Sequence, residues 1–415
     1  MMQPALIVAG LSVRMLAESA VQGGLEVAAL DVFGDADTRR ASKSWAPIGD
    51  AAAMAVDGEQ VLSALRRLRN LRPLGWVAGS GFEHVPGLLA AGHALLPLVG
   101  NDGATVRAVK DPTAFFAMLG AQGIPHPETA ARAPRDAAGW LCKTVGGSGG
   151  WHIHPAGKRA SPHPAYPVNA AAPSTPASGR YFQRRHRGYP MSALFLADGQ
   201  EARLVGVSLQ RVSAHAGGPY LFQGAAGPAP LASALTGRLT EILHCVVRET
   251  GLVGLNSLDF LLDGPDLLVL EVNPRPSASM ALYGDAHPGG LMQAHLQACR
   301  GALPAAQEVV MPASVRGFRL VLAGAAVQVD ATLTATLTRA GWCHDIPMPG
   351  TRIAAGQPFC TVSGIASTLT GIDVALRRRC SQIQTLLRNH HDDARHSSAS
   401  LPDRAAGGHG ARSRH

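Results

Sequence analysis

Residues 251–279 read GLVGLNSLDFLLDGPDLLVLEVNPRPSAS, and this stretch decides the fold. Read with a period of two, it predicts a β-hairpin with strands at 258–262 and 267–272. The dipeptide Gly264-Pro265 between them is a turn signal. Apart from a few polar residues, both predicted strands consist of Leu, Val and Phe. The hairpin is therefore expected to be buried.

Two carboxylates face each other across this predicted hairpin. Asp259 and Glu271 lie at equal distances from the turn centre, so an antiparallel pairing places their Cβ atoms roughly 5 Å apart. Asn273 shares their face. Like charges directly opposite are destabilising, and Mg²⁺ is the simplest cation that would compensate them. The alternative is an ordinary hairpin with two solvated carboxylates, but a buried pair needs a partner.

Size and composition indicate a globular protein. The 415 residues are enough for two or three domains, and 46% hydrophobic with 16% charged residues argues against general disorder. The N-terminus lacks the basic region of a signal peptide, and no apolar run reaches the length of a membrane span. The six cysteines are scattered without zinc-like spacing. We therefore expect a cytoplasmic protein with reduced thiols.

The charge pattern does not indicate nucleic-acid binding. The net charge is +8, but the basic residues are spread along the chain, without a basic helix interleaved with aromatics. Lysine is rare among the 37 basic residues, which draws attention to the four that occur: Lys43, Lys110, Lys143 and Lys158.

The N-terminal part predicts a βαβ unit with a parallel strand pair. Its strands are expected at 5–9 and 25–30, around a helix at 13–22. The turn after Gly10 lacks the G-x-G-x-x-G pattern, which argues against dinucleotide binding. Ser12, Arg14 and the loop 79–83 are candidates for substrate contact, because ligands bind at the carboxyl ends of parallel strands. They could equally be turn and cap residues.

The middle of the chain carries two lysines beside candidate phosphate-binding elements. Lys110 precedes a helix predicted over 111–120. Lys143 lies on a predicted strand and is followed by the glycine run 146–150, after which a strand resumes at 151–153. The backbone of such a hairpin tip can approach a phosphate closely. It is not a Walker A loop, because the G-K-[ST] ending and the following helix are missing.

The remaining segments are predicted from composition and periodicity. Residues 155–179 are rich in Pro, Ala and Ser and are expected to form a mobile loop. A final helix is predicted over 372–389. From His390 onward the chain has few apolar residues and no periodicity, and is expected to be disordered.

The order of these parts resembles the ATP-grasp superfamily, over roughly 5–303 and on to Asn389. The resemblance implies an α/β protein with the ATP-grasp fold, whose α+β lobes follow a Rossmann-like pre-ATP-grasp domain. The implied divisions are a pre-ATP-grasp domain over 1–105 and an ATP-grasp domain over 106–310. A C-terminal α+β segment over 311–389 would pack on the ATP-grasp domain, and a disordered tail would follow over 390–415.

The resemblance also implies which residues bind ATP. Lys110 and Lys143 would contact its phosphates, and Gln183 stands where the family commonly has a Glu or Gln beside the adenine or ribose. Three loop residues would fold over the phosphates: Gly147, Ser148 and Gly149. The chain departs from the family in the basic run 184–187, where an apolar strand residue is common, and this leaves the adenine contacts open.

Further roles implied by the resemblance concern metal and chemistry. Asp259 and Glu271 would bind Mg²⁺, with Mn²⁺ as an alternative, and Asn273 would complete a second ion. Arg275 would stabilise the transferred phosphoryl group. The implied activity is ligation of a small-molecule carboxylate to an amine through an acyl phosphate. No nucleic acid or membrane partner is expected, and a homo-oligomer is compatible with the sequence.

Four short sequence segments indicate a particular group within the superfamily: 12–14, 31–35, 79–83 and 356–362. They are similar to predicted carboxylate–amine ligases that are distantly related to biotin carboxylase and linked to the tetrahydromethanopterin and methanofuran C1 carriers. Two alternatives stay open: a carboxylase that activates bicarbonate, and a non-catalytic nucleotide-binding protein.

Overall fold

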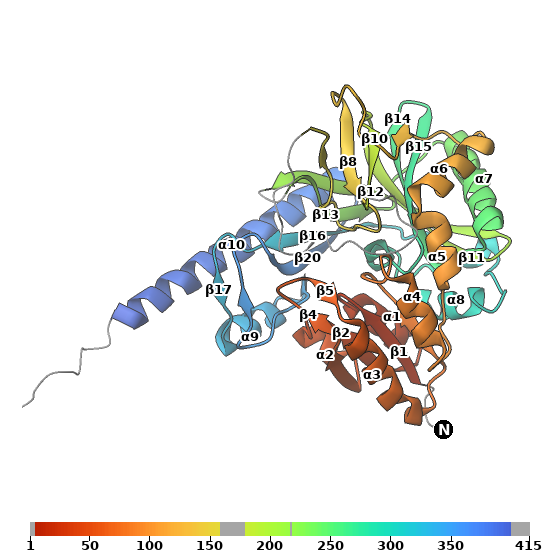
Figure 1. Ribbon diagram of the computed structural model, residues 1–415. Helices are drawn as coiled ribbons and strands as arrows, with labels where there is room; N and C mark the ends of the chain where they lie inside the picture. Colours follow the sequence, from red (N-terminus) through yellow and green to blue (C-terminus); the bar gives the residue numbers. More distant parts are fainter. Residues whose placement is uncertain (1–4, 158–178, 216–217, 400–415) are drawn as a thin grey trace, which may run out of the picture.

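The computed structural model describes residues 5–157, 179–215 and 218–399 (Figure 1). Most of the expected mobile loop 155–179 and the end of the chain after Ala399 lie outside these residues. The described strands form three main sheets, which we take in chain order.

The N-terminal α/β unit (residues 5–93) is built on a parallel sheet of order β3-β2-β1-β6. Figure 1 shows α1 and α3 beside this sheet. The parallel pair β1–β2 confirms the predicted βαβ unit. The strands are β1 (Ala5–Gly10), β2 (Glu26–Asp31), β3 (Ser44–Pro47) and β6 (Trp76–Ala78), with β4 (Gly49–Asp50) and β5 (Ala55–Val56) pairing separately; the helices are α1 (Arg14–Gln22), α2 (Ala36–Arg40), α3 (Gly58–Leu68) and α4 (Pro86–His93).

Two short helices then lead into a small antiparallel sheet of order β7-β10-β8-β9. Its strand β9 begins at His154, so the strand expected at 151–153 was placed too early in the sequence. The connection 145–153 contains two backbone hydrogen bonds of its own, from Gly147 N–H to Thr144 O and from Ile153 N–H to Gly150 O, so strand pairing resumes only at His154. The elements are α5 (Gly103–Lys110), α6 (Pro112–Ala121), β7 (Thr129–Ala130), β8 (Trp140–Thr144), β9 (His154–Pro155) and β10 (Arg180–Arg184).

The third sheet has eight strands in the order β15-β14-β11-β12-β13-β16-β20-β18. The predicted hairpin is its β14–β15 edge, and the C-terminal strands continue the same sheet through the β13–β16 pairing. Its strands are β11 (Tyr189–Asp198), β12 (Ala202–His215), β13 (Gly218–Gly227), β14 (Val253–Asp263), β15 (Asp266–Asn273), β16 (Val315–Leu322), β18 (Cys343–His344) and β20 (Pro358–Ala366). The other elements are α7 (Ser233–Thr250), α8 (Gly290–Ala298), α9 (Ala331–Arg339), α10 (Leu369–Ala399), and the pair β17 (Val327–Gln328) and β19 (Arg352–Ile353).

The final helix, α10, is longer than the predicted helix over 372–389, because it continues ten residues beyond Asn389. Its four buried residues on one face, Ile372, Leu376, Ile383 and Leu387, anchor the helix. Once a helix is anchored, each further residue adds one hydrogen bond and needs no apolar contact. The scarcity of apolar residues after 390 therefore did not indicate disorder up to Ala399. Figure 1 shows this end of α10 projecting from the body.

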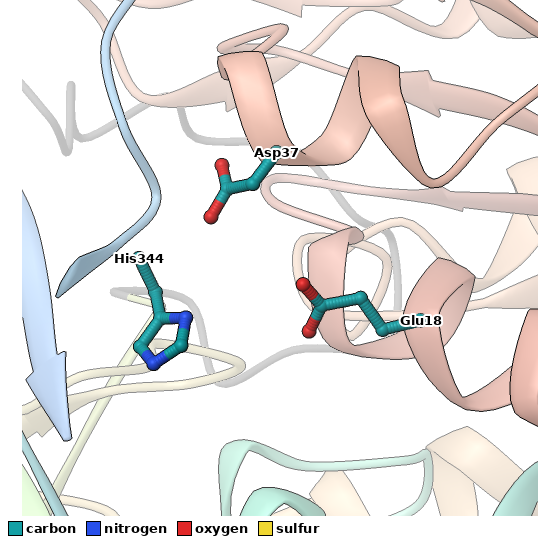
Figure 2. Close-up of side chains that lie close together, drawn as sticks. All are labelled: Glu18, Asp37 and His344. Atoms are coloured by element: carbon teal, nitrogen blue, oxygen red, sulfur yellow. The ribbon is translucent and has the colours of Figure 1, made fainter. Parts of the chain in front are cut away.

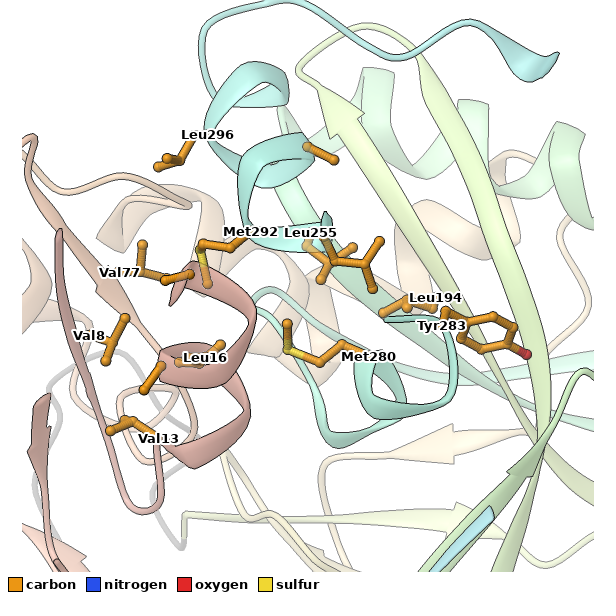
Figure 3. Packing of buried hydrophobic residues seen from close by; sticks show 14 of the residues in the cluster. Val8, Val13, Leu16, Val77, Leu194, Leu255, Met280, Tyr283, Met292 and Leu296 are labelled. Carbon is orange, nitrogen blue, oxygen red and sulfur yellow. The ribbon is translucent and has the colours of Figure 1, made fainter. Parts of the chain in front are cut away.

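One apolar core joins the N-terminal α/β unit to the large sheet (Figure 3). Leu16 on α1 and Val77 on β6 belong to the same buried cluster as Leu194 on β11 and Met292 on α8. These side chains come from both units, so separating the units would expose large apolar surfaces to water. The N-terminal loops are thereby held against the large sheet.

A cluster of charged residues connects the N-terminal α/β unit to the segment after β18 (Figure 2). The Arg14 guanidinium lies 2.8 Å from Glu18 Oε2 and 2.8 Å from Asp345 Oδ1. The backbone N–H of Asp345 donates to Asp37 over 2.8 Å. Figure 2 shows the side chains of Glu18, Asp37 and His344 pointing toward one another. One candidate ligand atom of each lies within 4.8 Å of those of the other two. Arg14 already compensates the charge of these carboxylates. We therefore interpret the cluster as a set of ion pairs that joins the N-terminal α/β unit to the C-terminal segment, rather than as a metal centre.

None of the helices in the described ranges combines the length and apolar character of a membrane span.

Candidate active site

The carboxylates of the β14–β15 hairpin face each other as predicted. Asp259 pairs with Glu271 in the strand register, directly before a bulge. Asn273 Nδ2 donates to Asp259 Oδ2 over 3.2 Å, and Ser192 Oγ donates to Asp259 Oδ1 over 2.6 Å. Burial and the charge of Glu271 raise the pKa of Asp259 to about 6. The two carboxylates therefore repel each other, and a cation bound between them would remove this repulsion.

Both candidate lysines converge on this pair. Lys110 Nζ lies 3.0 Å from Glu271 Oε2 and 3.5 Å from Asn273 Oδ1. Lys143 on β8 is buried, and burial lowers its pKa although Glu271 acts in the opposite direction. Burial alone would raise the pKa of Glu271, but Lys110 and Lys143 lower it. The site thus holds two ammonium groups beside two carboxylates.

The local setting of Lys110 differs in part from the prediction. The helix predicted over 111–120 is confirmed as α6, and Lys110 directly precedes its N-cap residue Asp111. The prediction did not include α5, of which Lys110 is the last residue. Asp111 separates the two helices, since its side chain accepts from the backbone N–H groups of Thr113 and Ala114 and so caps α6. The C-terminal end of a helix favours a cation, which suits a lysine there.

The glycine loop between β8 and β9 packs tightly against its surroundings. A Cβ on Gly147 would come within 2.4 Å of the His152 ring, and one on Gly150 within 1.9 Å of Tyr220 O. The backbone N–H of Phe222 donates to Gly149 O over 2.9 Å. These contacts require glycine and fix the loop on β13, so that Ser148, Gly149 and Gly150 line the cavity while Gly147 packs on His152.

Sequence reasoning missed His152, although it lies only two residues beyond the glycine run. Burial lowers the pKa of His152 to about 4, so its ring is neutral at pH 7. Its position under Gly147 supports the loop conformation. A histidine two residues after a glycine run was the only signal in the sequence.

Gln183 on β10 offers a buried donor to a ligand. The residue is 1% exposed, lines the cavity, and is opposite Leu141 in the β8–β10 register. Its Nε2 has no hydrogen-bond partner within the described part of the chain. An unsatisfied buried amide costs about 1–3 kcal/mol, so a ligand acceptor at this point would be favourable.

The basic run after Gln183 lies at the exposed end of β10. Arg184 is the last residue of the strand, and its guanidinium lies over the Trp140 ring at 5.5 Å from the centroid. Arg184 and Arg185 are exposed and belong to the cavity rim. The departure from an apolar strand residue is therefore accommodated by ending the strand here.

Arg275 meets a residue of the N-terminal α/β unit. Its Nε donates to Glu83 Oε1, and Glu83 Oε2 accepts from the backbone N–H of Gly81 over 2.7 Å. Burial would raise the pKa of Glu83, but the charges of Arg275 and Lys110 lower it to about 2. The loop 79–83 had been predicted as a substrate contact or a turn; its glutamate instead pairs with Arg275, whereas Gly79 and Ser80 line the cavity.

One cavity of about 1070 Å³ is lined by most of these groups, whereas Lys110 and Glu83 contact lining residues without lining it themselves. Its walls come from α1 and the loop after β6, from the small sheet with its glycine loop, and from the large sheet including Thr361 and Ser363 on β20. Ligand cavities commonly measure about 300–1,000 Å³, so this one has room for a nucleotide and a second small molecule.

Residues 109–279 match the family model of the ATP-grasp domain. Among solved structures, the L-amino acid ligase of Bacillus licheniformis aligns with a TM-score of 0.64 at 14% identity, covering 91% of this chain and 96% of the ligase. The ATP complex of carboxyaminoimidazole ribonucleotide synthase from Aspergillus clavatus aligns with a TM-score of 0.66 at 13% identity, covering 93% and 99%. Biotin carboxylase from Campylobacter jejuni gives 0.64 at 11% identity, covering 88% and 87%.

A search of curated protein sequences found no match. The chain has the ATP-grasp fold, within which residues 109–279 match the ATP-grasp domain.

Proposed function

We propose that the protein is an ATP- and Mg²⁺-dependent ligase that joins a small-molecule carboxylate to an amine through an acyl phosphate. The observation that carries this proposal is one cavity lined by two opposed carboxylates, an asparagine, a lysine and an arginine: Asp259, Glu271, Asn273, Lys143 and Arg275. A second lysine, Lys110, pairs with Glu271 over 3.0 Å. The likeness to an L-amino acid ligase in fold supports it.

Asp259, Glu271 and Asn273 would hold Mg²⁺, or Mn²⁺ in its place. The fit rests on the donor set, since hard cations take carboxylate and amide oxygens, and on the raised pKa of Asp259 beside Glu271. We propose that these three side chains would hold two ions. When bound, they would neutralise charge on the phosphate oxygens.

Four groups would hold ATP. Lys143 and Lys110 would contact the phosphates under the loop formed by Ser148 and Gly149, whose backbone can donate to phosphate oxygens. Gln183 would donate its free amide N–H to an acceptor of the adenine or ribose. Phosphoryl transfer needs positioning and charge neutralisation more than covalent help, and these side chains provide both.

Arg275 would stabilise the acyl phosphate on the substrate carboxylate until the amine attacks its carbonyl carbon and phosphate leaves. No serine, cysteine or histidine nucleophile is needed for this sequence of steps. The acid and amine would be precursors of a C1-carrier cofactor of the tetrahydromethanopterin or methanofuran type, and the enzyme would work in the cytoplasm.

The test is ADP formation from MgATP in a screen of amino acids combined with pterin and furan acids. The proposal predicts that ADP forms only when an acid and an amine are both present, and that a new amide product appears by mass spectrometry. Stimulation by bicarbonate alone would favour a carboxylase, which the biotin carboxylase likeness also supports. MgATP binding without turnover in any mixture would favour a non-catalytic nucleotide-binding protein.

A further inference from the structure

We propose that Glu83 is a positioning residue for Arg275, which it holds by the Nε edge so that the terminal guanidinium nitrogens face the reacting carboxylate. The inference rests on the proposed function, in which Arg275 contacts the transferred phosphoryl group. Glu83 would act only through Arg275 and would not touch the substrate itself.

The two oxygens of Glu83 are both engaged. Oε1 accepts from Arg275 Nε, and Oε2 accepts from the backbone N–H of Gly81 over 2.7 Å. The Glu83 side chain is 4% exposed and that of Arg275 is 13% exposed. A carboxylate fixed by a second donor cannot rotate away from the guanidinium, so the pairing sets the orientation of Arg275.

The loop that carries Glu83 requires glycine at residue 81. Gly81 has a φ of +104°, and a Cβ there would come within 2.9 Å of Leu11 and Val56. Only glycine adopts this backbone geometry readily. The carboxylate is therefore presented from a loop after β6 that packs closely on Leu11 and Val56. The N-terminal α/β unit thus contributes a residue to the site of the large sheet.

The hydrogen bonds of Arg275 leave one edge for a ligand. A guanidinium carries five N–H donors. Among the described residues, Nε donates to Glu83 and Nη1 donates to Pro276 O over 3.2 Å. The donors that are left belong to Nη1 and Nη2, which can grip two oxygens of a carboxylate or phosphate in parallel. Because Nε is paired with Glu83, Arg275 would bind a ligand through the Nη1 and Nη2 end of its guanidinium.

The test is a comparison of Glu83→Gln with Glu59→Gln, which removes an exposed carboxylate on α3 of the same unit. With the acid and amine that support ADP formation, Glu83→Gln is expected to lower kcat about 10- to 100-fold. Its MgATP affinity by calorimetry should stay within about twofold of wild type, because the nucleotide contacts are untouched. Glu59→Gln should change neither.

A double-mutant cycle separates positioning from a structural role. In an Arg275→Ala background, Glu83→Gln should cause no further loss of kcat, since the residue through which it acts is gone. Additive losses, or a lowered Tm with an unchanged kcat, would overturn the proposal. If Glu83→Gln does not fold, Glu83→Asp, whose carboxylate is one methylene further back, should show the same loss.

A spectroscopic arm does not depend on turnover. The Nε–H resonance of Arg275, assigned by its disappearance in Arg275→Lys, should shift in Glu83→Gln and stay in place in Glu59→Gln. An unmoved resonance refutes the pairing. Absence of ADP formation by the wild type in every substrate mixture refutes the proposed function instead, and the resonance still decides whether Glu83 holds Arg275.

Discussion

Replacing Glu271 by Gln should abolish Mg²⁺-dependent ATP turnover while leaving the fold intact. The substitution keeps the size and hydrogen-bonding oxygen of the side chain but removes the charge that opposes Asp259 and pairs with Lys110. Loss of one charged metal ligand is expected to lower turnover at least about 10³-fold, equivalent to about 4 kcal/mol.

The effect on stability follows from two opposing charge interactions. At an effective dielectric constant of about 20, the attraction between Lys110 Nζ and Glu271 Oε2 over 3.0 Å is about 5 kcal/mol. The repulsion between Glu271 and Asp259 is about 3 kcal/mol at a separation near 5 Å. The Glu271 side chain is 34% exposed, so water in the cavity screens both terms. The net loss should be about 1 kcal/mol, which lowers Tm by at most about 3 °C.

The assay couples ADP release to a spectrophotometric signal, with Mg²⁺ present or chelated, and a thermal melt of each variant reports the fold. Asp266→Asn is the matched control, because this exposed carboxylate lies at the turn end of the same strand. It should retain full turnover. If Glu271→Gln keeps more than about a tenth of the Mg²⁺-dependent activity, the metal assignment is wrong. A Tm lowered by more than about 10 °C would contradict the charge balance.

Three further predictions test individual side chains. Lys143→Met should weaken MgATP binding about 10- to 100-fold by calorimetry without lowering Tm, because the buried ammonium is costly in the free protein; unchanged affinity would remove Lys143 from the phosphate site. Gln183→Leu should leave Tm equal or higher, since the buried Nε2 has no partner in the described residues, and should reduce the preference for ATP over GTP; an unaltered preference would contradict the base contact. His295, whose Nδ1 accepts from Leu255 N over 2.8 Å, has its pKa lowered to about 4 by burial, so the unfolded state binds the extra proton between pH 6.5 and 4. Its contribution of up to about 3 kcal/mol is present above pH 6.5 and lost as pH falls to 4, so the stability gap between wild type and His295→Gln in urea should narrow over that range; a constant gap would show that His295 titrates normally.

Part of the site could be predicted because it is local in the sequence. The opposition of Asp259 and Glu271 follows from a turn and the two-residue period of strands, which hold whatever the rest of the chain does. The position of Lys143 before a glycine loop is local for the same reason. The order of the parts then indicated the ATP-grasp fold, as the family match over 109–279 bears out.

The limits of sequence reasoning appear where a local pattern is weak. The α5 helix that ends at Lys110 was missed, and the end of α10 was placed ten residues early, at Asn389. The boundary between α5 and α6 is set by the cap at Asp111, and the length of α10 is set by its anchored buried face. Hydrophobic periodicity indicates neither of these features. The assignment of ATP and metal roles to the site residues stays a prediction.

The hairpin with its paired carboxylates follows from the amino-acid sequence alone, because strand period and turn position act over about a dozen residues. Only the tertiary structure brought Lys110 to Glu271 and Glu83 to Arg275, across 161 and 192 residues. No periodicity encodes such contacts, since they depend on how the apolar faces of the N-terminal α/β unit and the large sheet pack together. The hairpin supplies the carboxylates, and the packing of the two units decides which charges meet them.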